Sequence, residues 1–171
     1  LLITGATGFV GQALCRYLLA QKGLVVPEAS DDREGQERKE VQENPTGRGS
    51  DIQLLIREPT DISKIPLQLG AGFILGSMQD EASLVAACSS INQIIHLAGL
   101  AHVAKGSEQQ TMDTTIQGTH NLLDAAIDAG VSRIVYLSSS LAEAADSSTG
   151  DVTAYGESKL QAEKLLQGAS S

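Results

Sequence analysis

A glycine-rich turn between an apolar run and a helical pattern is the feature that most constrains the fold of this chain. Residues 1–4 read Leu-Leu-Ile-Thr, and the turn that follows places Gly5, Gly8 and Gly11 three residues apart. Apolar residues then recur at helical spacing over residues 12–21. Glycine permits a tight turn and lets backbone approach a ligand or a neighbouring helix closely. This order of elements predicts a site where phosphate groups meet the amino end of a helix.

The rest of the chain alternates short apolar runs with helical patterns. We expect further strands at residues 51–56, 72–75, 91–98 and 133–138. We expect further helices at residues 81–88, 107–129 and 154–167. Strands that alternate with helices pair in parallel through right-handed crossovers. The predicted fold class is therefore α/β, a doubly wound parallel sheet of the Rossmann-like kind, and the 171 residues form one such domain.

Residues 26–50 interrupt this alternation. The segment holds seven acidic and four basic residues, together with two prolines and three glycines. A composition of this kind buries too little apolar surface to offset the entropy lost on ordering. We therefore expect a disordered polar insertion without a role of its own. The alternative is an acidic arm that binds a partner protein.

Charge and cysteine content exclude several classes of partner and site. The net charge of −9 argues against nucleic acid, which needs clustered Lys and Arg. We expect no membrane span and no signal peptide, because no apolar run is long enough and no basic leader precedes the first strand. With Cys15 and Cys88 as the two cysteines, we expect a cytoplasmic protein without disulfides. His102 and His120 lack ligand spacing, so we expect no metal site.

The end of the second strand bears on the choice of dinucleotide. The chain reads Arg57-Glu58 there. A carboxylate at this place accepts a hydrogen bond from the ribose 2′-hydroxyl of NAD, whereas an arginine accommodates the 2′-phosphate of NADP. Arg57 therefore favours NADP, and the adjacent Glu58 keeps NAD open.

A tyrosine and a lysine share one face of the last helix. Tyr155 and Lys159 are four residues apart within residues 154–167. An ammonium group beside a phenol favours the phenolate and lowers its pKa, which makes the tyrosine a usable acid and base. Residues 138–140 are three serines at the end of the fifth strand, where parallel sheets bind ligands. A hydroxyl there can bind the substrate oxygen that gains or loses a proton. Tyr136 is expected only to pack within that strand.

Five stretches of the chain together resemble a known family. They are residues 4–11, 94–99, 118–123, 135–140 and 155–159. They are similar to the extended short-chain dehydrogenase/reductases and, more narrowly, to the NAD-dependent epimerase/dehydratase group that acts on nucleotide-linked sugars. The resemblance implies an NAD(P)-dependent oxidoreductase or epimerase, in which a hydride moves between a nicotinamide and a sugar carbon. Whether the outcome is epimerisation, reduction or dehydration stays open.

The resemblance also implies roles for individual residues. The residues expected at the cofactor pyrophosphate are Gly5, Thr7, Gly8, Phe9, Val10 and Gly11. Ala98 and Gly99 would border the adenosine and its ribose. Tyr155 would be the catalytic acid and base, Lys159 would bind the nicotinamide ribose and bias the tyrosine, and Ser140 would orient the substrate. Pairing of two copies through helices 107–129 and 154–167 would give a homodimer.

The chain departs from the family pattern at four places. Ser77 stands where an aspartate usually contacts adenine, and Thr115 stands where an asparagine is common. The interval from Ser140 to Tyr155 is short for a nucleotide-sugar enzyme. The C-terminal substrate domain would follow Ser171, so we expect it to be missing and the chain to be a piece of a longer protein. These departures favour the alternative hypothesis, a non-catalytic NAD(P)-binding module with a regulatory or assembly role.

Overall fold

The strands form one parallel sheet, as expected. A computed structural model describes residues 1–21, 51–57, 71–99, 106, 108–147 and 152–169, so the expected insertion at residues 26–50 lies outside the described residues. The sheet has five strands in the order β3-β2-β1-β4-β5. Their bounds are β1 (Leu2–Thr4), β2 (Gln53–Ile56), β3 (Gly72–Leu75), β4 (Gln93–His96) and β5 (Arg133–Tyr136). All four pairings are parallel, which brings the carboxyl ends of the strands to one edge.

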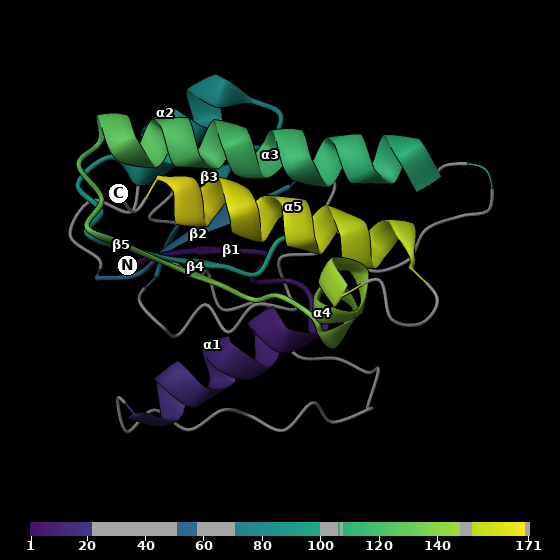
Figure 1. The fold of residues 1–171 in the computed structure, drawn as a ribbon. Coiled ribbons are helices and arrows are strands. Elements are labelled where there is room, and N and C mark those ends of the chain that lie inside the picture. The colour runs from purple at the N-terminus through teal and green to yellow at the C-terminus, as the bar shows by residue number, and fades with distance from the viewer. Residues whose placement is uncertain (22–50, 58–70, 100–105, 107, 148–151, 170–171) are drawn as a thin grey trace.

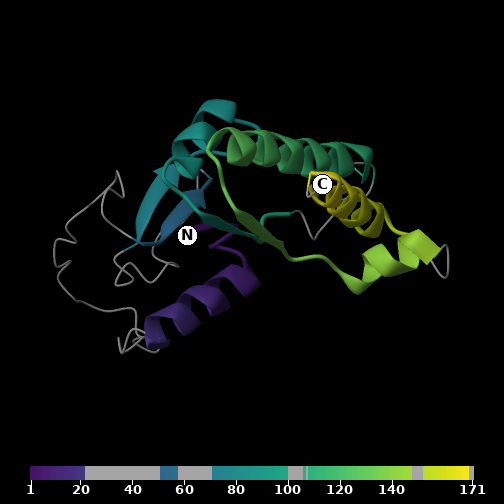
Figure 2. The same ribbon diagram turned by 60° about the vertical axis from the view of Figure 1, so that its left-hand side comes forward.

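Helices cover the two faces of this sheet unequally. The helices are α1 (Phe9–Gln21), α2 (Glu81–Cys88), α3 (Glu108–Asp128), α4 (Ser140–Ser147) and α5 (Ala154–Gly168). α1 lies on one face, whereas α2 and α3 lie on the other, and α5 runs beside α3 (Figures 1 and 2). α5 also packs against α4. The arrangement is a Rossmann-like α/β fold.

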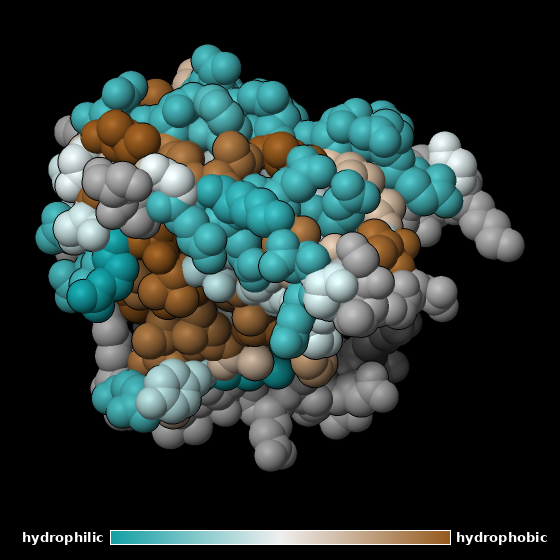
Figure 3. Space-filling view, in the orientation of Figure 1, coloured by the Kyte–Doolittle hydropathy of each residue, from teal (hydrophilic) through white to brown (hydrophobic). Residues whose placement is uncertain are grey.

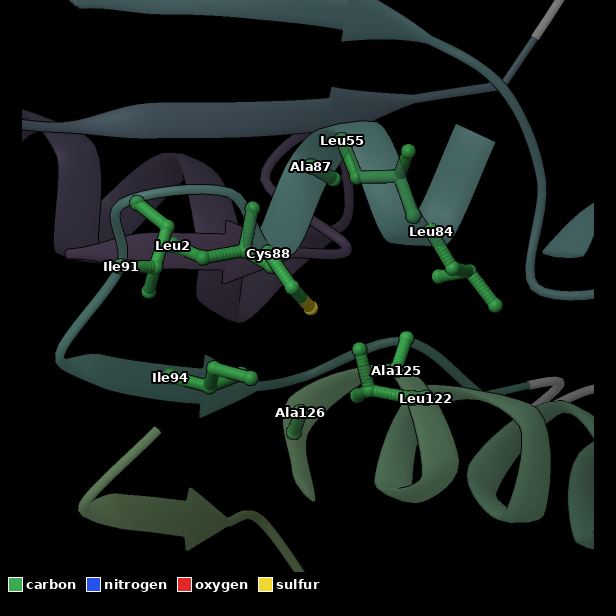
Figure 4. Close-up of a cluster of buried hydrophobic side chains, with 10 residues drawn as sticks. All are labelled: Leu2, Leu55, Leu84, Ala87, Cys88, Ile91, Ile94, Leu122, Ala125 and Ala126. Atoms are coloured by element: carbon green, nitrogen blue, oxygen red, sulfur yellow. The ribbon is translucent and has the colours of Figure 1, made fainter. Parts of the chain in front are cut away.

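Neighbouring residues of a strand enter different cores. Leu2 and Leu55 point into the core beneath α2 and α3, shown in Figure 4, while Ile3 and Leu54 point into the core beneath α1. Cys15 belongs to the second core and is fully buried. Each fully buried aliphatic side chain contributes about 1.5–3 kcal/mol. Burial on both faces explains why these strands read as nearly continuous apolar runs.

The structure moves several expected boundaries and adds one helix. β2 begins at Gln53 rather than at residue 51, and β4 spans Gln93–His96 rather than residues 91–98. α1 begins at Phe9 rather than at residue 12, because the Gly8 carbonyl already accepts the first helical hydrogen bond from the Gln12 N–H at 2.9 Å. β5 ends at Tyr136 rather than at residue 138. The serines that follow open α4, which the sequence did not predict. Ser139 precedes this helix and caps it, since its side-chain oxygen accepts from the Leu141 N–H at 3.2 Å.

The face of the sheet beside α1 keeps an exposed apolar area. Figure 3 shows it between α5 and α1, over β4 and β5. In and after β5, the side chains of Val135 and Leu137 remain 52% and 41% exposed. Within the described ranges, no helix is both long enough and apolar enough to span a bilayer.

Candidate functional site

A cavity of about 270 Å³ opens at the carboxyl edge of the sheet. Its walls come from the glycine turn, from the ends of β2, β3 and β4, and from α3. Of the residues expected to contact a cofactor, six line it: Gly5, Thr7, Gly8, Arg57, Ala98 and Gly99. Tyr155 and Lys159 come from α5 and are not among the lining residues. Lys159 lies against Gly99, which does line the cavity.

Backbone contacts explain the glycines of the turn. Gly5 has a φ of +74°, and a Cβ there would lie 2.6 Å from the Ala98 nitrogen. A Cβ on Gly11 would overlap the Gly5 carbonyl oxygen, so Gly11 lets α1 pack directly against the turn. Gly8 has more room, with its nearest neighbour, the Gly5 carbonyl oxygen, 3.3 Å from a Cβ. Gly5 and Gly11 are therefore required by the fold, while Gly8 keeps the cavity wall free of a side chain.

The amino end of α1 suits a diphosphate. Its first N–H groups have no helical acceptors and lie at the positive end of the helix dipole. The first turn of α1 carries no acidic residue that would repel an anion. Phe9 and Val10 stand at this end with side chains 93% and 44% exposed, outside the cavity lining. The turn and the helix start thus fit the diphosphate of a dinucleotide through backbone groups.

The far end of the cavity carries the residues that depart from the family pattern. Ser77 and Thr115 both line it, together with Met78. The Thr115 hydroxyl is buried and finds no hydrogen-bond partner among the described residues. Asp80, the first acid after β3, caps α2 by accepting from the Ser83 N–H at 3.4 Å. Its carboxylate is therefore part of the α2 N-cap. Arg57 lies in the wall, and Glu58 falls outside the described residues.

A row of polar side chains crosses the ends of three strands. Thr4, His96 and Tyr136 are register partners and therefore share one face of the sheet. Thr4 Oγ1 lies 2.7 Å from His96 Nδ1, and the rings of His96 and Tyr136 lie 5.2 Å apart. Burial, and to a smaller extent the nearby Lys159 cation, lower the pKa of His96 to about 3. His96 is thus a neutral core residue.

The hydrogen-bond network assigns the tautomer of His96. Thr119 Oγ1 donates its one hydrogen to the Thr115 carbonyl at 2.9 Å. It must therefore accept from His96 Nε2, which lies 3.3 Å away. Thr4 Oγ1 accepts from the Ala98 N–H at 3.3 Å, so its own hydrogen is free for His96 Nδ1. Thr4 Oγ1 and both ring nitrogens of His96 therefore have hydrogen-bond partners, and these bonds hold the end of β4 against the glycine turn.

Tyr155 and Lys159 lie one turn apart on α5. The helix starts at a Thr153 cap, whose Oγ1 accepts from the Gly156 N–H at 3.0 Å. Lys159 Nζ lies 5.8 Å from the Tyr155 ring centroid and donates to the Leu137 carbonyl at 3.0 Å. A Cβ on Gly99 would lie 3.1 Å from Nζ, so the ammonium stands directly behind the cavity wall. The structure thus places Lys159 directly behind the cavity wall with Tyr155 beyond it, and neither side chain is among the lining residues.

Burial and charge act in opposite directions on Lys159. Its side chain is 3% exposed, and burial lowers its pKa. The carboxylate of Glu163, one turn further along α5, raises the same pKa. Tyr155, Lys159 and Glu163 therefore form a helical stripe. The spacing of four residues is the sequence signal that could have identified Glu163 as a third member.

Ser140 occupies a second hollow, of about 580 Å³, beside α4 and α5. Three carboxylates share its lining: Glu143, Asp146 and Glu163. Ser140 is exposed there, while the hydroxyl of Ser138 is buried without a partner among the described residues. Glu163 is the member of the α5 stripe that reaches this hollow. Across the described ranges, no three His, Cys, Asp or Glu side chains gather as they would around a metal ion.

Comparison with known proteins agrees with this geometry. The family model described as "NAD dependent epimerase/dehydratase family" matches residues 1–171. Sterol demethylase protein B of Methylococcus capsulatus is 28% identical over 138 residues, which cover 81% of this chain and 34% of that protein.

Solved structures show the same similarity. The crystal structure of gox2253 is 29% identical with a TM-score of 0.68, covering 96% of this chain and 45% of its own. The Bordetella bronchiseptica enzyme WbmG in complex with NAD and UDP is 25% identical with a TM-score of 0.69. The match covers 98% of this chain and 48% of the WbmG chain. The chain therefore spans about half the length of these structures and a third of the curated relative.

Proposed function

Since the chain belongs to the NAD-dependent epimerase/dehydratase family, we propose that it is the cofactor-binding part of an NAD(P)-dependent oxidoreductase or epimerase acting on a nucleotide-linked sugar. One observation carries the proposal. The buried Lys159 ammonium stands between the Tyr155 ring, at 5.8 Å, and Gly99 in the wall of the cavity. Hydride transfer to or from an alcohol carbon requires an acid–base group beside the cofactor, and Lys159 adjoins the cavity through Gly99.

The residues of the cavity would hold the cofactor in named places. The backbone of Gly5, Thr7 and Gly8, with the N–H groups of Phe9 and Val10, would bind the diphosphate. Gly11 would act only through the packing of α1. Ala98 and Gly99 would border the adenosine and its ribose. When bound, NAD(P) supplies the hydride acceptor and donor of the reaction.

Proton transfer falls to the chain's own residues. Tyr155 Oη would accept the hydroxyl proton of the substrate as the alcohol is oxidised, and would return it on reduction. The Lys159 ammonium would face the Tyr155 ring and would hold the nicotinamide ribose. Ser140 would orient the substrate oxygen through its hydroxyl. The hollow beside Ser140 is lined by three carboxylates, which repel phosphate, so we place the sugar end of the substrate there.

Turnover on defined substrates tests the proposal. UDP- and dTDP-linked sugars are incubated with NAD or NADP, and product formation and absorbance of the reduced cofactor are followed. A sterol forms a separate arm, because a curated relative is named as a sterol demethylase protein. Turnover of a nucleotide sugar supports the proposal, and turnover of the sterol alone corrects its substrate class.

A non-catalytic NAD(P)-binding module is the second candidate. Ser77 and Thr115, which replace the usual aspartate and asparagine, favour it, while the intact Tyr155–Lys159 pair argues against it. Isothermal titration separates the two functions. Cofactor binding without turnover in any arm would support the module.

The choice between NAD and NADP gives a testable prediction. We expect Arg57→Ala to weaken NADP binding about 10- to 100-fold, because a hydrogen bond to a charged group contributes about 1.5–3 kcal/mol. NAD lacks the 2′-phosphate, so its affinity should change less than about threefold. Arg133→Ala, at the opposite end of the strands, is the control and should leave both dissociation constants unchanged. Equal losses for both cofactors would contradict a 2′-phosphate contact.

We place the protein in the cytoplasm, which agrees with its two free, buried thiols, Cys15 and Cys88.

We also propose that two copies of the chain pair through α3 and α5, where Ile127 is 60% exposed. Light scattering measures this directly, and a monomeric mass at micromolar concentration would contradict it.

A further inference from the structure

A buried lysine without a salt bridge needs another source of stabilisation. Lys159 is 3% exposed, and no carboxylate among the described residues lies within 4.0 Å of its Nζ. Among the described residues, its one hydrogen bond goes to the Leu137 carbonyl. An ammonium group that has left water is costly unless polar or charged partners replace the lost hydration. One carbonyl replaces only part of that shell.

The ring of Tyr136 lies where the missing stabilisation is needed. Lys159 Nζ stands over it at 4.6 Å from the centroid, closer than the 5.8 Å to the Tyr155 ring. A cation within about 6 Å of an aromatic face is attracted by the ring quadrupole, most strongly when desolvated. The Tyr136 hydroxyl is buried without a partner among the described residues. A buried tyrosine usually pairs its hydroxyl. Here the described contact of Tyr136 with Lys159 is made by the ring and not by the hydroxyl.

We propose that Tyr136 is a positioning residue for Lys159, whose ring holds the ammonium charged and directed at Tyr155 behind the cavity wall. Tyr136 is itself fixed by its register partner His96, with ring centroids 5.2 Å apart. The consequence for catalysis rests on the proposed function, whereas the contact between ring and ammonium does not.

The other titratable groups around Lys159 are consistent with a charged lysine. His96, from β4, is neutral because its pKa is about 3, so it adds no opposing cation. Burial raises the pKa of Tyr136, on β5, and Tyr155 and Glu163 raise it further, so Tyr136 stays a neutral phenol. Glu163 supports the ammonium from α5. The Tyr136 ring and the Glu163 carboxylate together oppose the lowering of the Lys159 pKa by burial.

The pKa of Lys159, measured by NMR titration of its labelled side chain, tests the inference. We expect Tyr136→Leu to lower that pKa by about one pH unit or more, since a desolvated cation–π contact contributes about 2 kcal/mol and one unit is about 1.4 kcal/mol. Tyr136→Phe keeps the ring and should leave the pKa within about 0.3 units. Equal shifts in the two variants, or none in either, would overturn the proposal.

A second series keeps the inference testable if Tyr136→Leu fails to fold. Phenylalanine at position 136 is replaced by its mono-, di- and trifluorinated forms, which keep nearly the same volume while weakening the ring quadrupole. The pKa of Lys159 should fall stepwise along the series. A flat series would overturn the proposal. Glu163→Gln is the positive control for the titration, because loss of the carboxylate must lower the same pKa.

Turnover gives a readout that separates this inference from the proposed function. If the protein turns over no substrate while the NMR shifts appear as expected, the proposed function fails and the ring contact stands. If turnover is found but the NMR shifts are absent, the contact fails alone.

Discussion

Replacing Tyr155 with phenylalanine is expected to lower turnover about 100- to 10,000-fold, the usual contribution of a positioned acid or base. The variant loses only the hydroxyl, and α5 keeps its Thr153 cap and its packing against α3 and α4. Cofactor binding should therefore change less than about threefold, because the diphosphate contacts come from the glycine turn. Steady-state kinetics and isothermal titration measure the two quantities separately.

The matched control for this prediction is Tyr17→Phe. Tyr17 lies on α1 with 60% of its side chain exposed, away from the cavity lining. Removing its hydroxyl should leave turnover and cofactor affinity unchanged. A loss of turnover below about tenfold in Tyr155→Phe would contradict acid–base catalysis by Tyr155.

Gly5→Ala is expected to have the largest effect on stability. Its φ of +74° disfavours any side chain, and a Cβ would lie 2.6 Å from the Ala98 nitrogen and 2.7 Å from the Leu97 carbonyl carbon. The conformation costs about 1–2 kcal/mol and the overlap with backbone about 1–3 kcal/mol more. We expect the free energy of unfolding to fall by about 2–5 kcal/mol. Cofactor binding should weaken with it, since the turn must shift away from β4.

Two other glycines separate these contributions. Gly130 has a φ of +71° with no atom within 4 Å of a Cβ, so Gly130→Ala measures the cost of the conformation alone. Gly168 has no positive φ, and a Cβ there would meet no atom of the described residues within 4 Å, so Gly168→Ala should be neutral or stabilising by up to about 1 kcal/mol. Denaturant unfolding measures all three variants. If Gly5→Ala costs no more than Gly130→Ala, the close approach of the turn to β4 is contradicted.

The centre of the sheet was predictable because β1 and β2 are buried on both faces. Leu54 and Leu55 enter opposite cores, which gives β2 the continuous apolar run that the sequence shows. The glycine turn was predictable for a similar local reason, since the conformation of Gly5 and the close packing of Gly11 admit no side chain. The extra helix α4 was not, because its cap at Ser139 lies within a serine run that also suits a strand end.

The surroundings of Lys159 depend on tertiary structure and could be predicted only in part. The spacing of Tyr155 and Lys159 within one helix indicates their shared face. The ring of Tyr136 reaches the ammonium because α5 crosses the end of β5, and no local pattern in β5 encodes that crossing. The sequence therefore predicts that Tyr136 packs, and the structure identifies the cation beside which it packs.

A crystal structure of the protein with bound NAD(P) tests the central claim most directly. The account predicts the diphosphate against Gly5 and Gly8 at the start of α1, with a nicotinamide ribose hydroxyl within about 3.2 Å of Lys159 Nζ. The Tyr155 hydroxyl should face the nicotinamide. A cofactor seated in the cavity with its nicotinamide directed away from Tyr155 and Lys159 would contradict the account.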